Sequence, residues 1–122
     1  MDNKEFSDEM KVRIYKWILR LIKFIDTLPK NDPVCRVTID QLIRCGTSVG
    51  ANYVEAIGSG TKKGFAQFVE YSLKSGNESK FWLALLRDSR SINKEEANIL
   101  LKEIDELTKI LGSSLGTMRN KK

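Results

Sequence analysis

The sequence predicts an all-α protein, an antiparallel up-down four-helix bundle that forms a single domain over residues 1–122. Three observations support this prediction. Four segments repeat their hydrophobic residues at the helical spacing of three and four. Short breaks that contain proline, glycine or polar residues separate the segments, which favours antiparallel neighbours. No stretch alternates hydrophobic and polar residues over the length of a strand.

Residues 8–28 form the first predicted helix. Its hydrophobic seam consists of Met10, Ile14, Trp17, Leu21, Phe24 and Leu28. Residues 34–57 form the second helix, with Asp32 as its N-cap. Its hydrophobic face consists of Ile39, Leu42, Ile43, Gly46, Val49, Gly50, Tyr53, Val54 and Ile57. Gly46 and Gly50 each disfavour a helix by about 1 kcal/mol, so we expect another backbone to come close to them.

Residues 62–89 form the third predicted helix, with Thr61 as its N-cap. Its hydrophobic face consists of Phe65, Phe68, Val69, Ser72, Gly76, Ser79, Leu83 and Leu86. The middle of this face is small, which predicts a tight crossing between the second and third helices. The residues expected to meet at that crossing are Gly46, Gly50, Ser72 and Gly76.

Residues 94–115 form the fourth predicted helix. Asn93 and Glu96 form an N-x-x-E variant of the capping box before it. Its hydrophobic face consists of Ala97, Leu100, Leu101, Ile104, Leu107, Leu111 and Leu115. Residues 116–122 are expected to be a frayed basic tail.

The composition limits the possible functions. The chain has no histidine, which excludes Ser–His and Cys–His nucleophiles and histidine metal sites. Together with the arguments given below, this leads us to expect no enzyme activity, no cofactor and no small-molecule substrate. Cys35 and Cys45 would lie about 15 Å apart along one helix, too far for a disulfide. The two reduced thiols and the acidic N-terminal segment predict a cytoplasmic protein. The longest apolar run is Phe81–Leu86, which is too short to span a membrane, so we expect no membrane contact.

The charge pattern suggests a polyanion as partner. The net charge is +5, and the first helix carries a basic stripe. The candidate nucleic-acid contacts are Arg13, Lys16, Arg20 and Lys23, followed by Lys62 and Lys63 at the start of the third helix. Such a stripe matches a phosphate backbone. Two other interpretations remain open, a solvated helix face and a basic charge that serves solubility alone. No aromatic stacking platform accompanies the stripe.

The third helix is hydrophobic on every side from Phe81 to Leu86. Phe81, Trp82 and Leu85 point away from its core face, which predicts self-association with Trp82 as an anchor. The alternative is that bundle twist and the neighbouring loop cover them.

Two polar rows face away from the predicted core. One consists of Arg44, Ser48, Asn52 and Glu55, and the other of Tyr71, Ser75, Glu78 and Trp82. We interpret them as a hydrogen-bond network between subunits. Glu55 and Glu78 also resemble paired catalytic or metal-binding carboxylates, but bundle metal sites add histidines and point inward. The loop from Gly58 to Gly64 lacks phosphate-loop spacing and is interpreted as a turn between helices.

Several segments of the sequence resemble those of a known family. The relevant segments are Gln41-Leu-Ile-Arg44, Ser48-Val-Gly-Ala-Asn52, Glu55, Gly58-Ser-Gly-Thr-Lys-Lys63, Phe65-x-x-Phe68 and Ser75-Gly-Asn-Glu78. Together they resemble the four-helix bundle proteins encoded in intervening sequences of bacterial 23S ribosomal RNA. Gly50 stands where the family usually has proline, and Ala56 stands where it usually has glycine. A glycine there changes the local kink without the lost N–H of a proline.

The resemblance implies a small homo-oligomeric protein without enzyme activity, with a ring of five subunits as the expected form. A more distant relative is the accessory variability determinant of diversity-generating retroelements, which binds nucleic acid and a reverse transcriptase. The leading hypothesis is thus a non-catalytic homo-oligomer that binds RNA weakly. The rival hypothesis is a protein-interaction scaffold that touches no nucleic acid.

Overall fold

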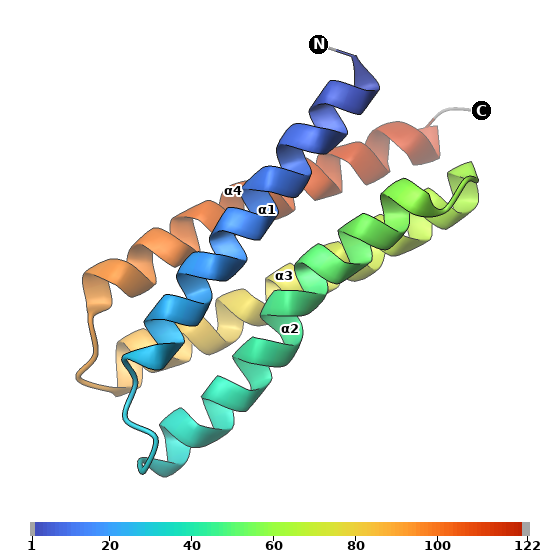
Figure 1. The fold of residues 1–122 in the computed structure, drawn as a ribbon. Helices are drawn as coiled ribbons and strands as arrows, with labels where there is room; N and C mark the ends of the chain where they lie inside the picture. Colours follow the sequence, from blue (N-terminus) through green and yellow to red (C-terminus); the bar gives the residue numbers. More distant parts are fainter. Residues whose placement is uncertain (1, 121–122) are drawn as a thin grey trace.

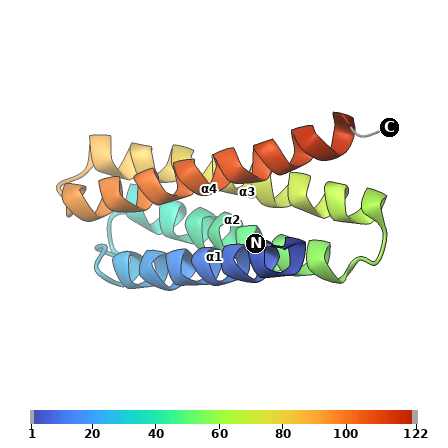
Figure 2. The ribbon, with the colours of Figure 1, turned by 90° about the horizontal axis from the view of Figure 1, so that it is seen from above.

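The computed structural model describes residues 2–120, and the side chains of residues 2–118. Within this range the chain forms four helices and no strand. They are α1 (Asn3–Asp26), α2 (Pro33–Gly58), α3 (Lys62–Ser89) and α4 (Lys94–Asn120) (Figure 1). Consecutive helices run in opposite directions, and the α1–α2 and α3–α4 pairs form two layers (Figure 2). The predicted all-α four-helix architecture is confirmed.

Polar side chains cap the helices as predicted. An Asp32 carboxylate oxygen accepts the backbone N–H of Cys35 at 2.9 Å, and Pro33 occupies the first helical position. Thr61 Oγ1 accepts the N–H of Gly64 at 3.0 Å, and Asn93 Oδ1 accepts the N–H of Glu96 at 3.1 Å. These bonds pair N–H groups that have no partner inside the helix.

Both terminal helices are longer than the sequence predicted. α1 begins at Asn3, because Asp2 caps it by accepting the N–H of Glu5 at 2.7 Å. Residues 116–122 were expected to be a frayed tail, and this is wrong for residues 116–120, because α4 continues to Asn120. Leu115 is buried and Met118 is half-buried, so the hydrophobic spacing of α4 continues beyond its predicted end. Residues 121–122 lie outside the described part.

The core is one cluster to which all four helices contribute. Hydrogen bonds across the bundle fix how the helices face one another. Trp17 Nε1 donates to the Leu100 carbonyl at 3.0 Å and joins α1 to α4. Ser72 Oγ donates to the Val49 carbonyl at 2.7 Å and joins α3 to α2.

The predicted tight crossing of α2 and α3 is confirmed at Ser72, which bonds the Val49 carbonyl, but the part that the glycines were expected to play in it is wrong. Gly50 faces α1, since a Cβ there would lie 2.7 Å from Ile18 Cδ1, and Gly46 likewise faces the Leu21 side chain of α1. Gly76 faces α4, where its Cβ would lie 2.6 Å from Thr108 Cγ2. The glycines therefore let α1 approach α2 and α4 approach α3.

Candidate nucleic-acid interface and assembly surfaces

The predicted basic stripe of α1 is divided by ion pairs with α4. The Arg13 guanidinium binds Glu103 through Nη2 at 2.8 Å and Nε at 3.2 Å, and Nη2 also lies 3.1 Å from Glu106. The Arg20 guanidinium binds Glu96 through Nε at 2.5 Å and Nη2 at 3.0 Å. Both arginines lie in a groove of about 490 Å³ between α1 and α4.

The ion pairs alter the charge that α1 presents. The hydrogen bond from Arg20 holds the pKa of Glu96 below its usual value, against a smaller opposing effect of burial. This carboxylate therefore stays ionised and offsets the arginine charge. Lys16 and Lys23 are exposed, and among the described residues neither forms an ion pair. Two of the four predicted cations are thus available to an anionic partner.

The sequence contains a signal for these pairs. Arg13 and Arg20 are seven residues apart on α1, and Glu96 and Glu103 are seven residues apart on α4. In antiparallel neighbours this spacing brings the first arginine to the second glutamate and the second arginine to the first. The pairing was not predicted because each helix was considered without its neighbour.

Lys62 and Lys63 are exposed at the end of the bundle where α1 begins. Lys62 borders a pocket together with Asn3 and Phe6, whereas Lys23 lies near the opposite end of α1. The structure therefore does not bring the six candidate residues into one patch. Arg119, Lys121 and Lys122, which were expected to add charge in the tail, have side chains outside the described part.

The two predicted polar rows bond within their own helices. On α2, Arg44 Nε lies 3.4 Å from Asp40, and Asn52 Nδ2 donates to the Ser48 carbonyl at 3.0 Å. On α3, Trp82 Nε1 donates to Glu78 Oε2 at 3.1 Å. Glu55 is exposed and Ser75 is half-buried. Within residues 2–120 no three cysteine, aspartate or glutamate side chains gather at metal-binding distance.

The outer face of α3 carries a hydrophobic ridge, which we define as Tyr71, Phe81, Trp82 and Leu85. Phe81 is 60% exposed and Tyr71 is 41% exposed. Phe81 meets Trp82 edge to face, with ring centroids 5.0 Å apart. Trp82 itself packs against the core and is only partly exposed, as is Leu85. The prominent side chain of the ridge is therefore Phe81 rather than the predicted anchor Trp82.

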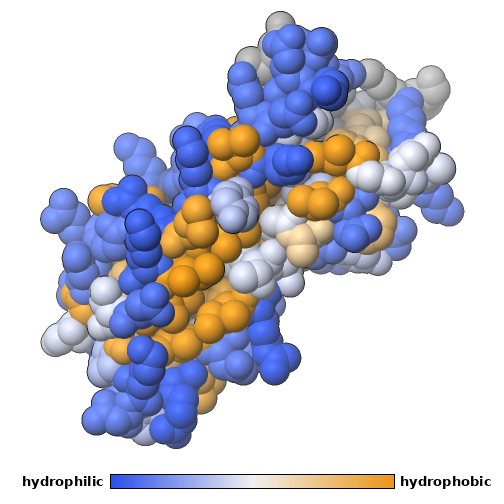
Figure 3. Space-filling model, in the orientation of Figure 1, coloured by the Kyte–Doolittle hydropathy of each residue, from blue (hydrophilic) through white to orange (hydrophobic). Residues whose placement is uncertain are grey.

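A second hydrophobic surface lies over α1 and α2 and was not predicted. We call it the α1/α2 strip, and it consists of Val12, Tyr15, Leu19, Ile22, Ile43 and Val54, which are 40–62% exposed. Figure 3 shows hydrophobic residues in a band along the face formed by α1 and α2. Ile43, Val54 and Ile57 were assigned to the core, and that assignment is wrong. Ile43 and Val54 lie at the solvent edge of the α2 face, and Ile57 lies in the last turn of α2.

A groove of about 440 Å³ opens within this strip between α1 and α2. Tyr15 and Ile18 form one wall, and Thr47 and Val54 form the other. Gly50 lies on its lining, where a side chain would collide with Ile18. The spacing of Val12, Tyr15, Leu19 and Ile22 forms a second hydrophobic seam on α1, which could have revealed the strip.

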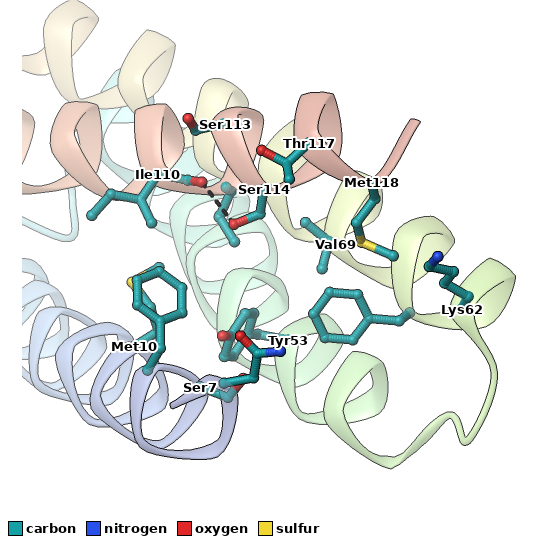
Figure 4. A pocket seen from close by; sticks show the side chains of 14 residues that line it. Ser7, Met10, Tyr53, Lys62, Val69, Ile110, Ser113, Ser114, Thr117 and Met118 are labelled. Atoms are coloured by element: carbon teal, nitrogen blue, oxygen red, sulfur yellow. Dashed lines mark hydrogen bonds between the residues drawn. The ribbon is translucent and has the colours of Figure 1, made fainter. Parts of the chain in front are cut away.

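A third hollow of about 640 Å³ lies at the end of the bundle where α1 begins and α4 ends (Figure 4). Met10 and Tyr53 lie on one side of it, and Ile110 and Ser114 lie on the other. Ser114 Oγ donates to the Ile110 carbonyl at 3.1 Å. Burial raises the pKa of the Tyr53 hydroxyl, so this group stays protonated at neutral pH.

Within residues 2–120, none of the four helices is both long enough and apolar enough to cross a membrane.

Comparisons with known proteins agree with the fold. A crystal structure of a protein of unknown function from the S23 ribosomal protein family of Bacteroides thetaiotaomicron is similar to this chain. It is 27% identical, with a TM-score of 0.81, and the match covers 90% of this chain and 97% of that one. No curated protein matches the chain. The 23S rRNA-intervening sequence protein family matches residues 9–113, which confirms the resemblance seen in the sequence. The chain therefore belongs to the 23S rRNA-intervening sequence protein family.

Proposed function

We propose that this protein is a non-catalytic, self-associating helical bundle of the cytoplasm that contacts RNA phosphates weakly and without base readout. The observation that carries this proposal is the exposure of unpaired lysines on a chain of net charge +5. Lys16 and Lys23 are the primary contacts, and Lys62 and Lys63 add a second patch. Arg13 and Arg20 are assigned a structural role, because they already form ion pairs with carboxylates of α4.

Self-association strengthens such weak contacts. Lys16 and Lys23 lie seven residues apart on α1, so the two of them in a single copy bind a phosphate chain only weakly. Copies joined in one particle present their lysines to the same RNA, which raises the overall affinity through effective concentration. If each protomer contributes two phosphate contacts, its share of the log–log salt slope is about −1.8, whereas four contacts would give about −3.6.

Two double variants with the same charge change test the assignment. Lys16→Gln with Lys23→Gln removes the free cations, and Arg13→Gln with Arg20→Gln removes the paired ones. Affinity for labelled single-stranded and structured RNA is measured between about 50 and 200 mM salt. We expect the lysine variant to flatten the salt slope and the arginine variant to retain most of it. Equal effects would contradict the assignment, and no binding by the wild type at micromolar protein would refute RNA contact.

The second candidate is a protein-interaction scaffold without nucleic-acid binding. The arginine–glutamate pairs favour it, because they offset half of the predicted basic stripe. The α1/α2 strip favours it as well, since exposed hydrophobic surface is typical of protein contacts. Absence of RNA binding in the same titration, with self-association retained, is the result that this candidate predicts.

A further inference from the structure

The hollow of about 640 Å³ at one end of the bundle, which we call the end pocket, lies where α4 diverges from α1 (Figures 1 and 2). Along the middle of α4, the large side chains of Leu100, Ile104 and Leu107 fill the core. Nearer the end of α4, Ser114 and Thr117 line the end pocket instead. Because these side chains are small, they leave the space between the helices unfilled. Its volume lies within the range of about 300–1,000 Å³ that is typical of small-molecule sites.

The floor of the end pocket is apolar. Met10, Val69 and Leu111 come from three different helices, and each is at most 3% exposed. Tyr53 of α2 completes the floor, and the Ser7 side chain is the hydrogen-bond partner of its hydroxyl. Among the described residues, no buried polar side-chain atom lacks a hydrogen-bond partner. A polar group placed on this floor would lose its water without compensation, so the floor suits a hydrocarbon chain.

The rim of the end pocket is polar and carries positive charge. Lys62 and Thr117 are exposed there. Lys62 is the one charged side chain among the described residues that line the pocket, and no ion pair within this part of the chain engages it. It lies in the first turn of α3, where the helix dipole adds positive potential. Asp8 lies outside the lining, and its charge affects the pKa of Tyr53 less than burial does. The rim therefore favours an anionic group.

We propose that the end pocket binds a single-chain anionic amphiphile, a medium-chain fatty acid. Its hydrocarbon chain lies on the apolar floor, and its carboxylate lies at the rim beside Lys62. No thiol or carboxylate occurs among the described residues that line the pocket, so the acid is a ligand rather than a substrate. The inference goes beyond the proposed function, because it depends neither on RNA contact nor on self-association.

Methionine methyl groups report on the end pocket directly. Met10 and Met118 line it, and their side chains lie on opposite sides of the hollow (Figure 4). Met1 is the only other methionine of the sequence. Wild-type protein with isotopically labelled methionine methyl groups is titrated with sodium decanoate at submillimolar concentration and followed by NMR. Met10→Leu and Met118→Leu assign the resonances. We expect both to shift and to saturate with one dissociation constant. Octanoate should bind about threefold to tenfold more weakly, since it has two fewer methylene groups to bury.

Two lysine variants with the same charge change test the position of the carboxylate. Lys62→Gln removes the rim charge, and Lys63→Gln is the matched control, because Lys63 is the next residue of α3 but does not line the pocket. We expect Lys62→Gln to weaken decanoate binding about threefold, as for an exposed ion pair, and Lys63→Gln to leave it unchanged. Neither variant should alter the affinity for decanol, which carries no charge.

Thr117→Phe tests the position of the hydrocarbon chain. Thr117 is exposed, so a larger side chain is tolerated by the fold, which far-UV circular dichroism and Tm check. The added ring occupies the end pocket and should weaken decanoate binding at least tenfold.

Several outcomes would overturn the proposal. One is the absence of decanoate-dependent shifts at Met10 and Met118. Equal weakening by the two lysine variants, or full affinity in Thr117→Phe, would place the acid elsewhere. Shifts that follow protein dilution rather than decanoate would mean that a second copy occupies the end pocket. Decanoate binding with the expected variant effects, in a protein that binds no RNA, would refute the proposed RNA contact and support the end pocket.

Discussion

Replacing Gly76 with alanine tests how closely α3 and α4 pack. A Cβ at this position would lie 2.6 Å from Thr108 Cγ2 and 3.4 Å from Ile104 Cδ1. Thr108 is 3% exposed and branched at Cβ, and its Oγ1 donates to the Asp105 carbonyl at 3.0 Å. Its side chain therefore has little freedom to move aside, so the two helices must separate locally.

The expected magnitude follows from two opposing effects. Overpacking a core typically costs 1–3 kcal/mol, whereas replacing glycine with alanine in a helix stabilises by about 1 kcal/mol. We expect a net loss of about 1 kcal/mol in the free energy of unfolding, or about 4 °C in Tm for a chain of this size. Thermal unfolding followed by circular dichroism at fixed protein concentration measures it.

Gly116→Ala is the matched control. Gly116 lies in α4, and no heavy atom would lie within 4 Å of its added Cβ. Only the helix-propensity effect remains, which near a helix end is a gain of about 0.5 kcal/mol. Opposite signs for the two variants are therefore expected. A Gly76→Ala protein as stable as the Gly116→Ala protein would refute the close contact between α3 and α4.

Two further substitutions test the bonds that join the helices. Asp32→Ala should lower Tm by a few degrees, because it removes a helix cap and the 2.9 Å ion pair with Arg90. The backbone N–H of Cys35, and after it the Arg90 side chain, hold the pKa of the Asp32 carboxyl in the folded protein below its usual value. The ionised carboxylate therefore stabilises the fold fully above the pKa that Asp32 has in the unfolded chain. This stabilisation is lost as the pH falls through the lower pKa of the folded protein. Trp17→Phe should cost about 2–3 kcal/mol, because it removes a buried hydrogen bond to the Leu100 carbonyl and leaves a cavity.

Different measurements would contradict the predictions for Asp32→Ala and Trp17→Phe. The Tm difference between the wild type and Asp32→Ala should be constant near neutral pH and shrink in acid. A difference that grows below pH 4 would contradict the stated cause. For Trp17→Phe, urea unfolding that shows a loss below 1 kcal/mol would mean that the indole hydrogen bond adds little.

Much of the fold was predictable because polar N-caps mark where three of the four helices begin. Asp32, Thr61 and Asn93 cap helices that begin where the sequence indicated. The end of α4 was missed because residues 116–122 were interpreted as a frayed basic tail. Met118 nevertheless extends the hydrophobic spacing past Gly116, and the helix continues with it.

The candidate site was harder to predict because it depends on which helix lies beside which. Arg13 and Arg20 form a basic stripe on α1 alone, but α4 supplies the carboxylates that pair with them. In the same way, Val54 belongs to the hydrophobic half of α2, yet α1 does not reach far enough to bury it. Periodicity identifies the hydrophobic half of a helix, whereas the position of its neighbours decides which edge of that half stays exposed.

The most direct test of the account is the mass of the wild-type protein in sedimentation experiments across a micromolar dilution series. Two hydrophobic surfaces on one small bundle predict particles of several chains, with a mass that falls towards that of one chain only on dilution. A single species of 13.9 kDa at every concentration would contradict self-association, and with it the proposed presentation of lysines to RNA by assembled copies.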